Sequence, residues 1–166
     1  MAEMYIRTVW NITSNIKETS PGAGVKPPRK GYGIMRRTSK NRYYNPNPLK
    51  KETSDCVVRA LCALTSEPWD DVYKELCEIG FEIKEMPNSK NSYETYLKKH
   101  GYTRFPISNK KGTKRPTVND MAKRSKDGMN YLCDIANHLV TVSEGYILDL
   151  WDSGEKCLYA YWTKAE

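Results

Sequence analysis

Residues 138–151 read HLVTVSEGYILDLW, and this stretch decides the C-terminal half of the fold. A run with three β-branched residues, Val140, Thr141 and Val142, comes first, then Glu144 and Gly145, then a second apolar run. Two such runs joined by two turn-forming residues are typical of a β-hairpin. The sequence therefore predicts strands over 138–143 and 146–151, connected by a tight turn.

The register of this hairpin brings polar residues together. With a two-residue turn, Ser143 lies opposite Tyr146, and every other pairing follows from that one. His138 then faces Trp151, and Asp149 lies two residues away on the same side of the sheet. A histidine and a carboxylate are therefore expected to meet on one face of the hairpin.

Helices come before these strands in the chain. Residues 56–64 are apolar on nearly every side apart from Arg59, which indicates a helix buried in the core. Three further helices are expected over 68–80, 91–100 and from 117, and two further strands over 131–135 and 157–162. Thr117 and Asp120 have the spacing of a capping box. Helices followed by an antiparallel meander predict an α+β fold, in which the buried helix and the other helices pack on a C-terminal sheet.

Cys56 opens the buried helix, after Ser54 and Asp55, which are both good capping residues. The thiolate is the reactive form of a cysteine, and the positive end of a helix stabilises its negative charge. An ordinary buried cysteine would have the same surroundings in sequence, and we expect that role for Cys62. Cys56 is the candidate nucleophile.

Together, Cys56, His138 and Asp149 fit a catalytic set. The histidine would take the proton of the thiol, and the carboxylate would orient the ring and stabilise its charged form. Trp151 would shield this pair from water, and the neighbouring Asp152 points to the other face unless a bulge intervenes. The alternatives are a structural histidine and a core tryptophan. The matching position of the carboxylate favours the catalytic interpretation.

Composition limits the class of protein. The chain has 166 residues and a net charge of +7, which fits one domain and a tail. Five cysteines without CxxC spacing argue against a disulfide framework and against structural zinc. Two distant histidines complete no metal cluster, and no phosphate-binding glycine loop occurs, so we expect neither a metal nor another cofactor. Without a membrane-spanning run or a secretory leader, an intracellular protein is expected.

The positive charge is concentrated at the front of the chain. Residues 1–51 hold eleven lysines and arginines against two acids, whereas the remainder is slightly acidic. Frequent glycine and proline predict a basic, extended arm over 1–45, with one strand-like segment at 4–12, before a domain over 46–166. Cations beside aromatics suit nucleic acid, although a solvated tail is the alternative. The candidate residues are Arg36, Arg37, Lys40, Arg42, Tyr43 and Tyr44.

The order of a cysteine at a helix start, Asn137-His138 on a strand and Asp149-Leu150-Trp151 on the next resembles the papain-like cysteine peptidase superfamily. The resemblance implies a papain-like fold and a cysteine hydrolase or acyl transferase that acts on a peptide or amide. Papain-like enzymes usually have Asn-Ser-Trp at the acid position and a Gln before the cysteine, which helps to stabilise the oxyanion. This chain contains no Gln. Thr53, Ser54 or Asn47 would have to supply the missing donor, beside the Cys56 N–H.

A second likeness is to small proteins of tailed bacteriophages and prophages. It rests on the patterns RR…YYNPNP, DCVVRA, HxxxVxxG, DxWDS and YxYW, which fall within residues 35–164. This resemblance implies a phage protein that works in the host cytoplasm or in the virion. Two functions stay open at this point. One is a phage-encoded cysteine hydrolase, and the other is a weak or inactive papain-like fold that binds a host factor or forms part of the virion.

Overall fold

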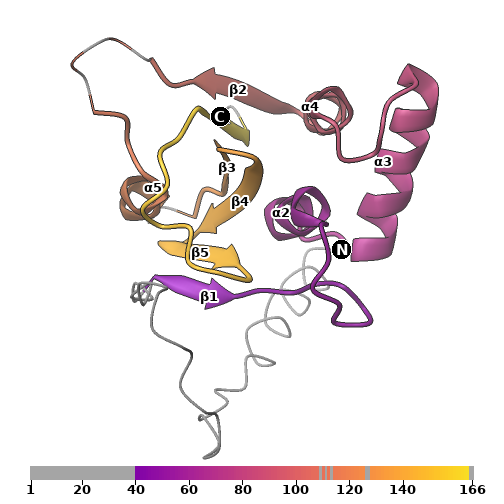
Figure 1. Cartoon of the computed structure of the whole chain (residues 1–166), viewed down its shortest axis with the longest axis horizontal. Coiled ribbons are helices and arrows are strands. Elements are labelled where there is room, and N and C mark those ends of the chain that lie inside the picture. The colour runs from indigo at the N-terminus through magenta and orange to yellow at the C-terminus, as the bar shows by residue number, and fades with distance from the viewer. Residues whose placement is uncertain (1–39, 109, 111, 113, 126–127, 165–166) are drawn as a thin grey trace, which may run out of the picture. The chain divides into compact units, whose positions relative to one another are not determined.

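A computed structural model gives the structure of residues 40–108, 110, 112, 114–125 and 128–164 (Figure 1). This part of the chain contains four helices and a six-stranded sheet, which confirms the predicted α+β class. The helices are α2 (Cys56–Thr65), α3 (Trp69–Ile83), α4 (Lys90–Lys99) and α5 (Val118–Arg124). The strands are β1 (Asn41–Tyr43), β2 (Tyr102–Pro106), β3 (Tyr131–Ile135), β4 (His138–Ser143), β5 (Tyr146–Asp149) and β6 (Ala160–Lys164). None of these helices has the length and apolar character needed to cross a membrane.

The strands lie in the order β1-β5-β4-β3-β6-β2, and all described neighbours except β1 and β5 are antiparallel. The β4–β5 hairpin has the predicted register, with Ser143 opposite Tyr146. Both turn residues have a positive φ, 48° at Glu144 and 83° at Gly145. This is the geometry of a type I′ turn, whose twist matches that of the strands it connects. The predicted hairpin is therefore confirmed.

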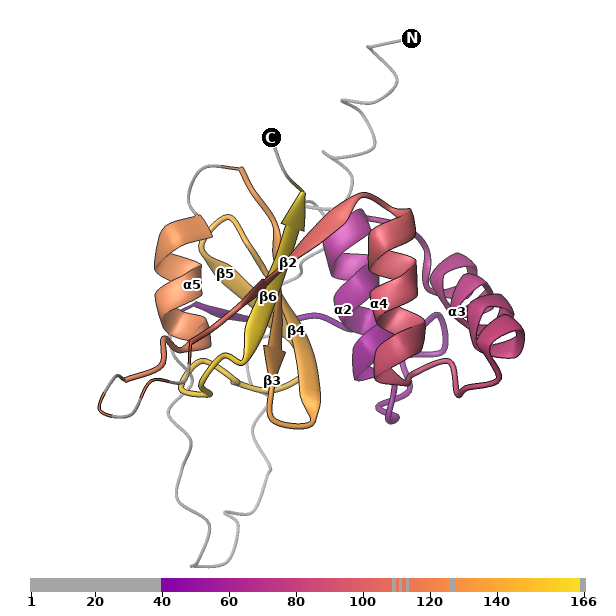
Figure 2. The ribbon, with the colours of Figure 1, turned by 90° about the horizontal axis from the view of Figure 1, so that it is seen from above.

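Helices cover both faces of the sheet. Figure 2 shows α2, α3 and α4 on one side of the strands and α5 on the other. The first side holds the larger apolar core, in which α2 residues such as Leu61 and Cys62 pack against Leu132 and Trp162 of the sheet. The second core joins α5 to the opposite side of the strands. The sheet is thus the middle layer of three.

Helix α2 lies deep in the first core. Its residues from Val57 to Leu64 are all buried, in agreement with the apolar pattern of the sequence. Thr141 of β4 donates a hydrogen bond from Oγ1 to the backbone carbonyl of Ala60 at 2.6 Å. Each Å² of apolar surface removed from water stabilises the fold by about 25 cal/mol. Because α2 is buried on every side, it contributes strongly to the stability of this core. Its first residue, Cys56, is consequently held in a fixed position beside the sheet.

The predicted elements differ from the observed ones mainly at the sheet edges. The predicted strand over 157–162 begins only at Ala160, and it pairs with β3 rather than continuing the meander beside β5. Strand β2 was not predicted. Strand β1 was not predicted either, and it lies within the segment that the sequence assigned to the arm. The strand-like segment at 4–12 lies outside the described residues.

One smaller prediction agrees with the structure. The capping box at the start of α5 is present, because Thr117 accepts a hydrogen bond from the Asp120 N–H and the Asp120 carboxylate accepts one from the Thr117 N–H.

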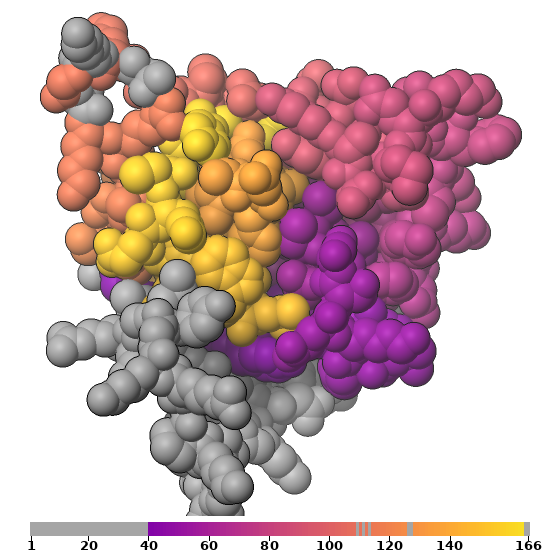
Figure 3. Space-filling model, in the orientation of Figure 1, coloured from indigo at the N-terminus to yellow at the C-terminus, as the bar shows by residue number. Residues whose placement is uncertain are grey.

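In Figure 3, the segment that leads into α2 adjoins the surface of the C-terminal strands. This contact includes a backbone hydrogen bond of 3.1 Å from the Tyr44 N–H to the Asp149 carbonyl.

Candidate active site

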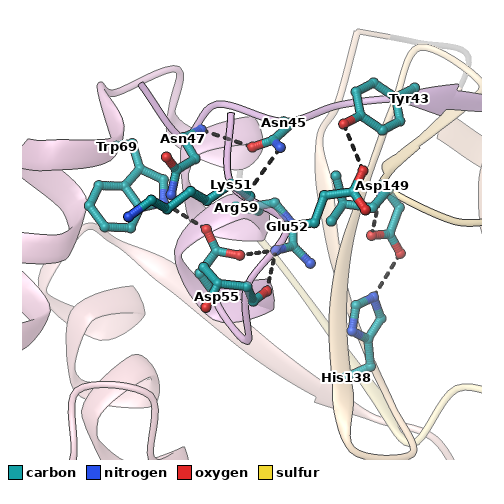
Figure 4. Close-up of polar contacts among 12 residues, drawn as sticks. Tyr43, Asn45, Asn47, Lys51, Glu52, Asp55, Arg59, Trp69, His138 and Asp149 are labelled. Atoms are coloured by element: carbon teal, nitrogen blue, oxygen red, sulfur yellow. Dashed lines mark hydrogen bonds and ion pairs between the residues drawn. The ribbon is translucent and has the colours of Figure 1, made fainter. Parts of the chain in front are cut away.

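A histidine and an aspartate form a close pair at the open end of the β4–β5 hairpin. Nε2 of His138 lies 2.7 Å from Oδ2 of Asp149 (Figure 4). The Asp149 side chain is almost fully buried, and its Oδ1 accepts a hydrogen bond of 2.8 Å from the Leu150 N–H. Both carboxylate oxygens are thus engaged, which fixes the orientation of the carboxylate and of the ring it holds.

The ionisation of His138 depends on this pair. Burial lowers the pKa of the imidazole, but the hydrogen bonds to Asp149 and Cys56 and the negative charges of both raise it to about 9. The charged form of the ring is therefore favoured at neutral pH. The hydrogen bond to Asp149 is the largest of the influences that raise this pKa.

Cys56 lies on the other side of the same histidine. Burial raises the pKa of its thiol, but the hydrogen bond and charge of His138 lower it, together with the backbone N–H groups of Leu139 and Val57. The net shift is downward, toward the thiolate. Cys56, His138 and Asp149, which the sequence analysis selected, thus come together in the order sulfur, ring and carboxylate.

The start of α2 carries no side-chain cap. Asp55 occupies the N-cap position, but its carboxylate makes no capping hydrogen bond. Instead, Oδ1 pairs with Nη1 of Arg59, and Oδ2 accepts a hydrogen bond of 3.0 Å from Nε1 of Trp69. Figure 4 shows both contacts. The prediction that Asp55 caps the helix is therefore wrong, and the N–H groups of the first turn remain available to the Cys56 sulfur.

Arg59 is a buried cation behind the site, and the sequence analysis noted it only as an interruption of the apolar pattern. Its side chain pairs with Asp55, and Nη1 donates to the Thr53 carbonyl at 3.2 Å. Burial lowers the pKa of the guanidinium, and the negative charge of Asp149 is the strongest influence that raises it. Arg59 therefore links the acid of the histidine pair to the residue before the cysteine.

The supporting residues predicted from the sequence, Trp151, Asp152 and Ser54, have different surroundings in the structure. The Trp151 ring lies against the His138 ring, with centroids 5.0 Å apart, and remains 37% exposed. It covers one side of the imidazole, as expected. Asp152 accepts a hydrogen bond from the Gly154 N–H at 3.0 Å, which stabilises the turn after β5. Ser54 is exposed.

The structure describes four of the proposed nucleic-acid residues, Lys40, Arg42, Tyr43 and Tyr44, and all of them lie in or next to β1. Tyr44 is half-buried and packs against the core around α2. Arg42 lies over the Tyr146 ring at 4.4 Å, and the Tyr43 hydroxyl donates to Glu52 at 3.1 Å. Lys40 is half-buried at the start of β1, and Arg36 and Arg37 lie outside the described residues.

One cluster of potential metal ligands lies away from this site, where the sequence analysis expected no metal. Glu67, Glu75 and His100 bring ligand atoms within 4.8 Å of one another. Lys99 binds Glu75 at 2.7 Å, and Tyr96 donates a hydrogen bond of 2.7 Å to Glu67. These contacts already neutralise or occupy the carboxylates, so we interpret the cluster as a polar network that joins α3 and α4.

The comparisons with known proteins give no further assignment. Neither family models, nor curated proteins, nor solved structures include a match to this chain.

Proposed function

We propose that this protein is a thiol-dependent hydrolase or acyl transferase that acts on the carbonyl carbon of a peptide, amide or ester. Cys56 is the nucleophile, His138 the proton carrier and Asp149 the residue that orients the histidine. The observation that carries the proposal is the arrangement of the three side chains, in which His138 is hydrogen-bonded to Cys56 and lies 2.7 Å from the Asp149 carboxylate. The lowered pKa of the thiol and the raised pKa of the imidazole agree with it. Such a thiolate–imidazolium pair supplies an attacking sulfur and a proton for the leaving group at the same pH.

The reaction would proceed in two steps. The Cys56 thiolate attacks the carbonyl carbon, and His138 gives its proton to the leaving amine or alcohol as the acyl–sulfur bond forms. Neutral His138 then takes a proton from water, or from an amine acceptor, which attacks the thioester and releases Cys56. Trp151 covers the ring during both proton transfers. Nothing in this scheme selects between peptidase, amidase, deamidase and acyl-transfer chemistry.

The proposal includes the papain-like arrangement and the phage context suggested by the two sequence resemblances. In this view, a buried helix starts with the cysteine and packs on antiparallel strands that carry the histidine and the acid. The helix burial and the β4–β5 register support this view. The same hypothesis states that the protein acts in the host cytoplasm or in the virion.

Thiol alkylation tests the proposal without knowledge of the substrate. Cys157 is exposed and provides an internal reference for an ordinary thiol, whereas Cys56 is only half-accessible. With iodoacetamide at pH 6–7, we expect Cys56 to react faster than Cys157, as measured for each peptide by mass spectrometry. His138→Ala should abolish this advantage, and Cys77→Ala, a change at a half-buried cysteine on α3, should leave it intact. Slower labelling of Cys56 than of Cys157 in the wild-type protein would refute the proposal.

A binding role is the second candidate, and one surface favours it. Phe81 and Met86, at and just after the C-terminal end of α3, are 76% and 70% exposed. Exposed aromatic and methionine side chains are enriched where proteins bind partners. A protein whose Cys56 labels slowly, and which nevertheless binds a host or virion protein through this end of α3, would fit the second candidate.

A further inference from the structure

Attack of a thiolate on a carbonyl group places negative charge on the carbonyl oxygen, and a catalyst needs hydrogen-bond donors at that oxygen. The Cys56 backbone N–H, at the uncapped start of α2, is one such donor. The side chains suggested by the sequence as second donors have different surroundings. Thr53 and Ser54 are exposed to solvent, and Asn47 is held in its own loop, where Oδ1 accepts the Leu49 N–H at 3.0 Å.

Tyr93 is a buried tyrosine of α4 that belongs to the core packed around α2. Its side chain is 7% exposed, and Cys56 packs against the same apolar cluster. The tyrosine and the cysteine come from different helices, separated by more than thirty positions in the sequence. Only tertiary packing brings them into one region, so Tyr93 could not be predicted from the sequence.

The Tyr93 hydroxyl has no hydrogen-bond partner among the residues that the structure describes, and it is not among their completely enclosed unpaired polar atoms. The two other buried tyrosines of this core both donate a hydrogen bond, Tyr96 to Glu67 at 2.7 Å and Tyr102 to the Leu64 carbonyl at 3.4 Å. Because it is not completely enclosed, the Tyr93 hydroxyl can reach water or a bound ligand and is free to donate a hydrogen bond there.

Electrostatics relate this hydroxyl to the reactive sulfur. Burial raises the pKa of the Tyr93 phenol, the charges of Asp134, Glu94 and Cys56 raise it further, and Arg104 opposes them. The phenol therefore keeps its proton at neutral pH and remains a hydrogen-bond donor. Cys56 is the smallest of these influences, and it agrees with the packing that places both residues at the same core.

We propose that Tyr93 is a catalytic residue of this site and donates a hydrogen bond to the oxyanion that forms when Cys56 attacks a carbonyl group. The inference rests on the proposed function. As the carbon–sulfur bond forms, the π electrons of the carbonyl move to its oxygen, where the Tyr93 O–H and the Cys56 N–H hold the charge. Collapse of this intermediate restores the carbonyl and expels the leaving group, which takes the proton from His138 when it is basic.

Two reactions of the same sulfur separate this role from a structural one. Acylation by p-nitrophenyl acetate passes through an oxyanion, whereas alkylation by iodoacetamide displaces iodide and forms none. We expect Tyr93→Phe to slow acylation of Cys56 by about 100- to 1,000-fold, the loss typical of one oxyanion donor. Alkylation should stay within about two-fold, since the thiolate itself is unchanged. Tyr102→Phe, in the same core but bonded near the other end of α2, should slow neither reaction.

The outcomes are distinct. If both reactions keep their wild-type rates in Tyr93→Phe, or both fall together, Tyr93 is not an oxyanion donor. A selective loss of acylation in Asn47→Asp, which removes the amide donor but keeps Oδ1, together with none in Tyr93→Phe, would assign the role to Asn47 instead. If Cys56 of the wild-type protein is neither acylated nor rapidly alkylated, the proposed function itself fails.

Discussion

Replacement of Asp149 by asparagine tests the electrostatic basis of the site. The hydrogen bond and charge of Asp149 are the leading causes of the upward shift at His138, from 6.5 to about 9. At about 1.4 kcal/mol per pKa unit, the full shift corresponds to about 3 kcal/mol, shared between Asp149 and Cys56. The asparagine Oδ1 can keep the Leu150 N–H, but its amide group presents a donor to a ring nitrogen that was itself a donor.

The pH dependence of this variant follows from the direction of the shift. A histidine with a raised pKa stabilises the folded state fully below its unfolded value of about 6.5, and this contribution is lost as pH rises through about 9. Asp149→Asn should therefore lower the free energy of unfolding by up to about 3 kcal/mol at pH 6, and by less at pH 9.5.

The assay combines urea unfolding at the two pH values with an NMR titration of the His138 ring. We expect the His138 pKa to fall by at least one unit in the variant, and the alkylation advantage of Cys56 to shrink with it. Asp71→Asn, on the exposed side of α3, is the matched control and should change neither quantity. A titration of His138 that stays near 9 in Asp149→Asn would refute the reasoning.

Two further predictions concern stability. Arg59→Met leaves the buried Asp55 carboxylate without its cation, although the hydrogen bond from Trp69 remains, and should cost about 3 kcal/mol in urea unfolding; a loss below 1 kcal/mol would mean that the pair is unimportant. Thr117→Ala removes the capping box of α5 and should cost about 1 kcal/mol; no change in the unfolding midpoint would argue that Asp120 alone holds the start of this helix.

The sequence was most informative where local rules determine the structure. A two-residue turn fixes the β4–β5 register, and the alternation of side chains then brings His138 and Asp149 to one face. Helix α2 followed from its continuous apolar composition. In both cases the pattern lies within a short segment. The period of the apolar residues and the type of turn were therefore sufficient to predict the element.

The remaining features depend on contacts between distant segments. Aspartate is a favoured N-cap residue, but the Asp55 carboxylate binds a buried arginine and a tryptophan from α3 instead. No local rule predicts these contacts. Strand β1 has three residues and pairs in parallel with β5, so its own sequence is too short to reveal it. Tyr93 looks like any other apolar position of α4 until the position of α2 is known.

The pairing of β1 with β5 has a practical consequence. The backbone just before Asn45 holds the strand that ends in Asp149, through the parallel ladder and the Tyr44 hydrogen bond. A shortened protein that starts at residue 46 would keep every side chain of the candidate site, but it would lose the strand pairing that positions Asp149. A deletion that is meant to remove the basic arm should therefore end before Lys40. A longer deletion would also remove the β1–β5 pairing, and a loss of activity would then not show that the arm takes part in the reaction.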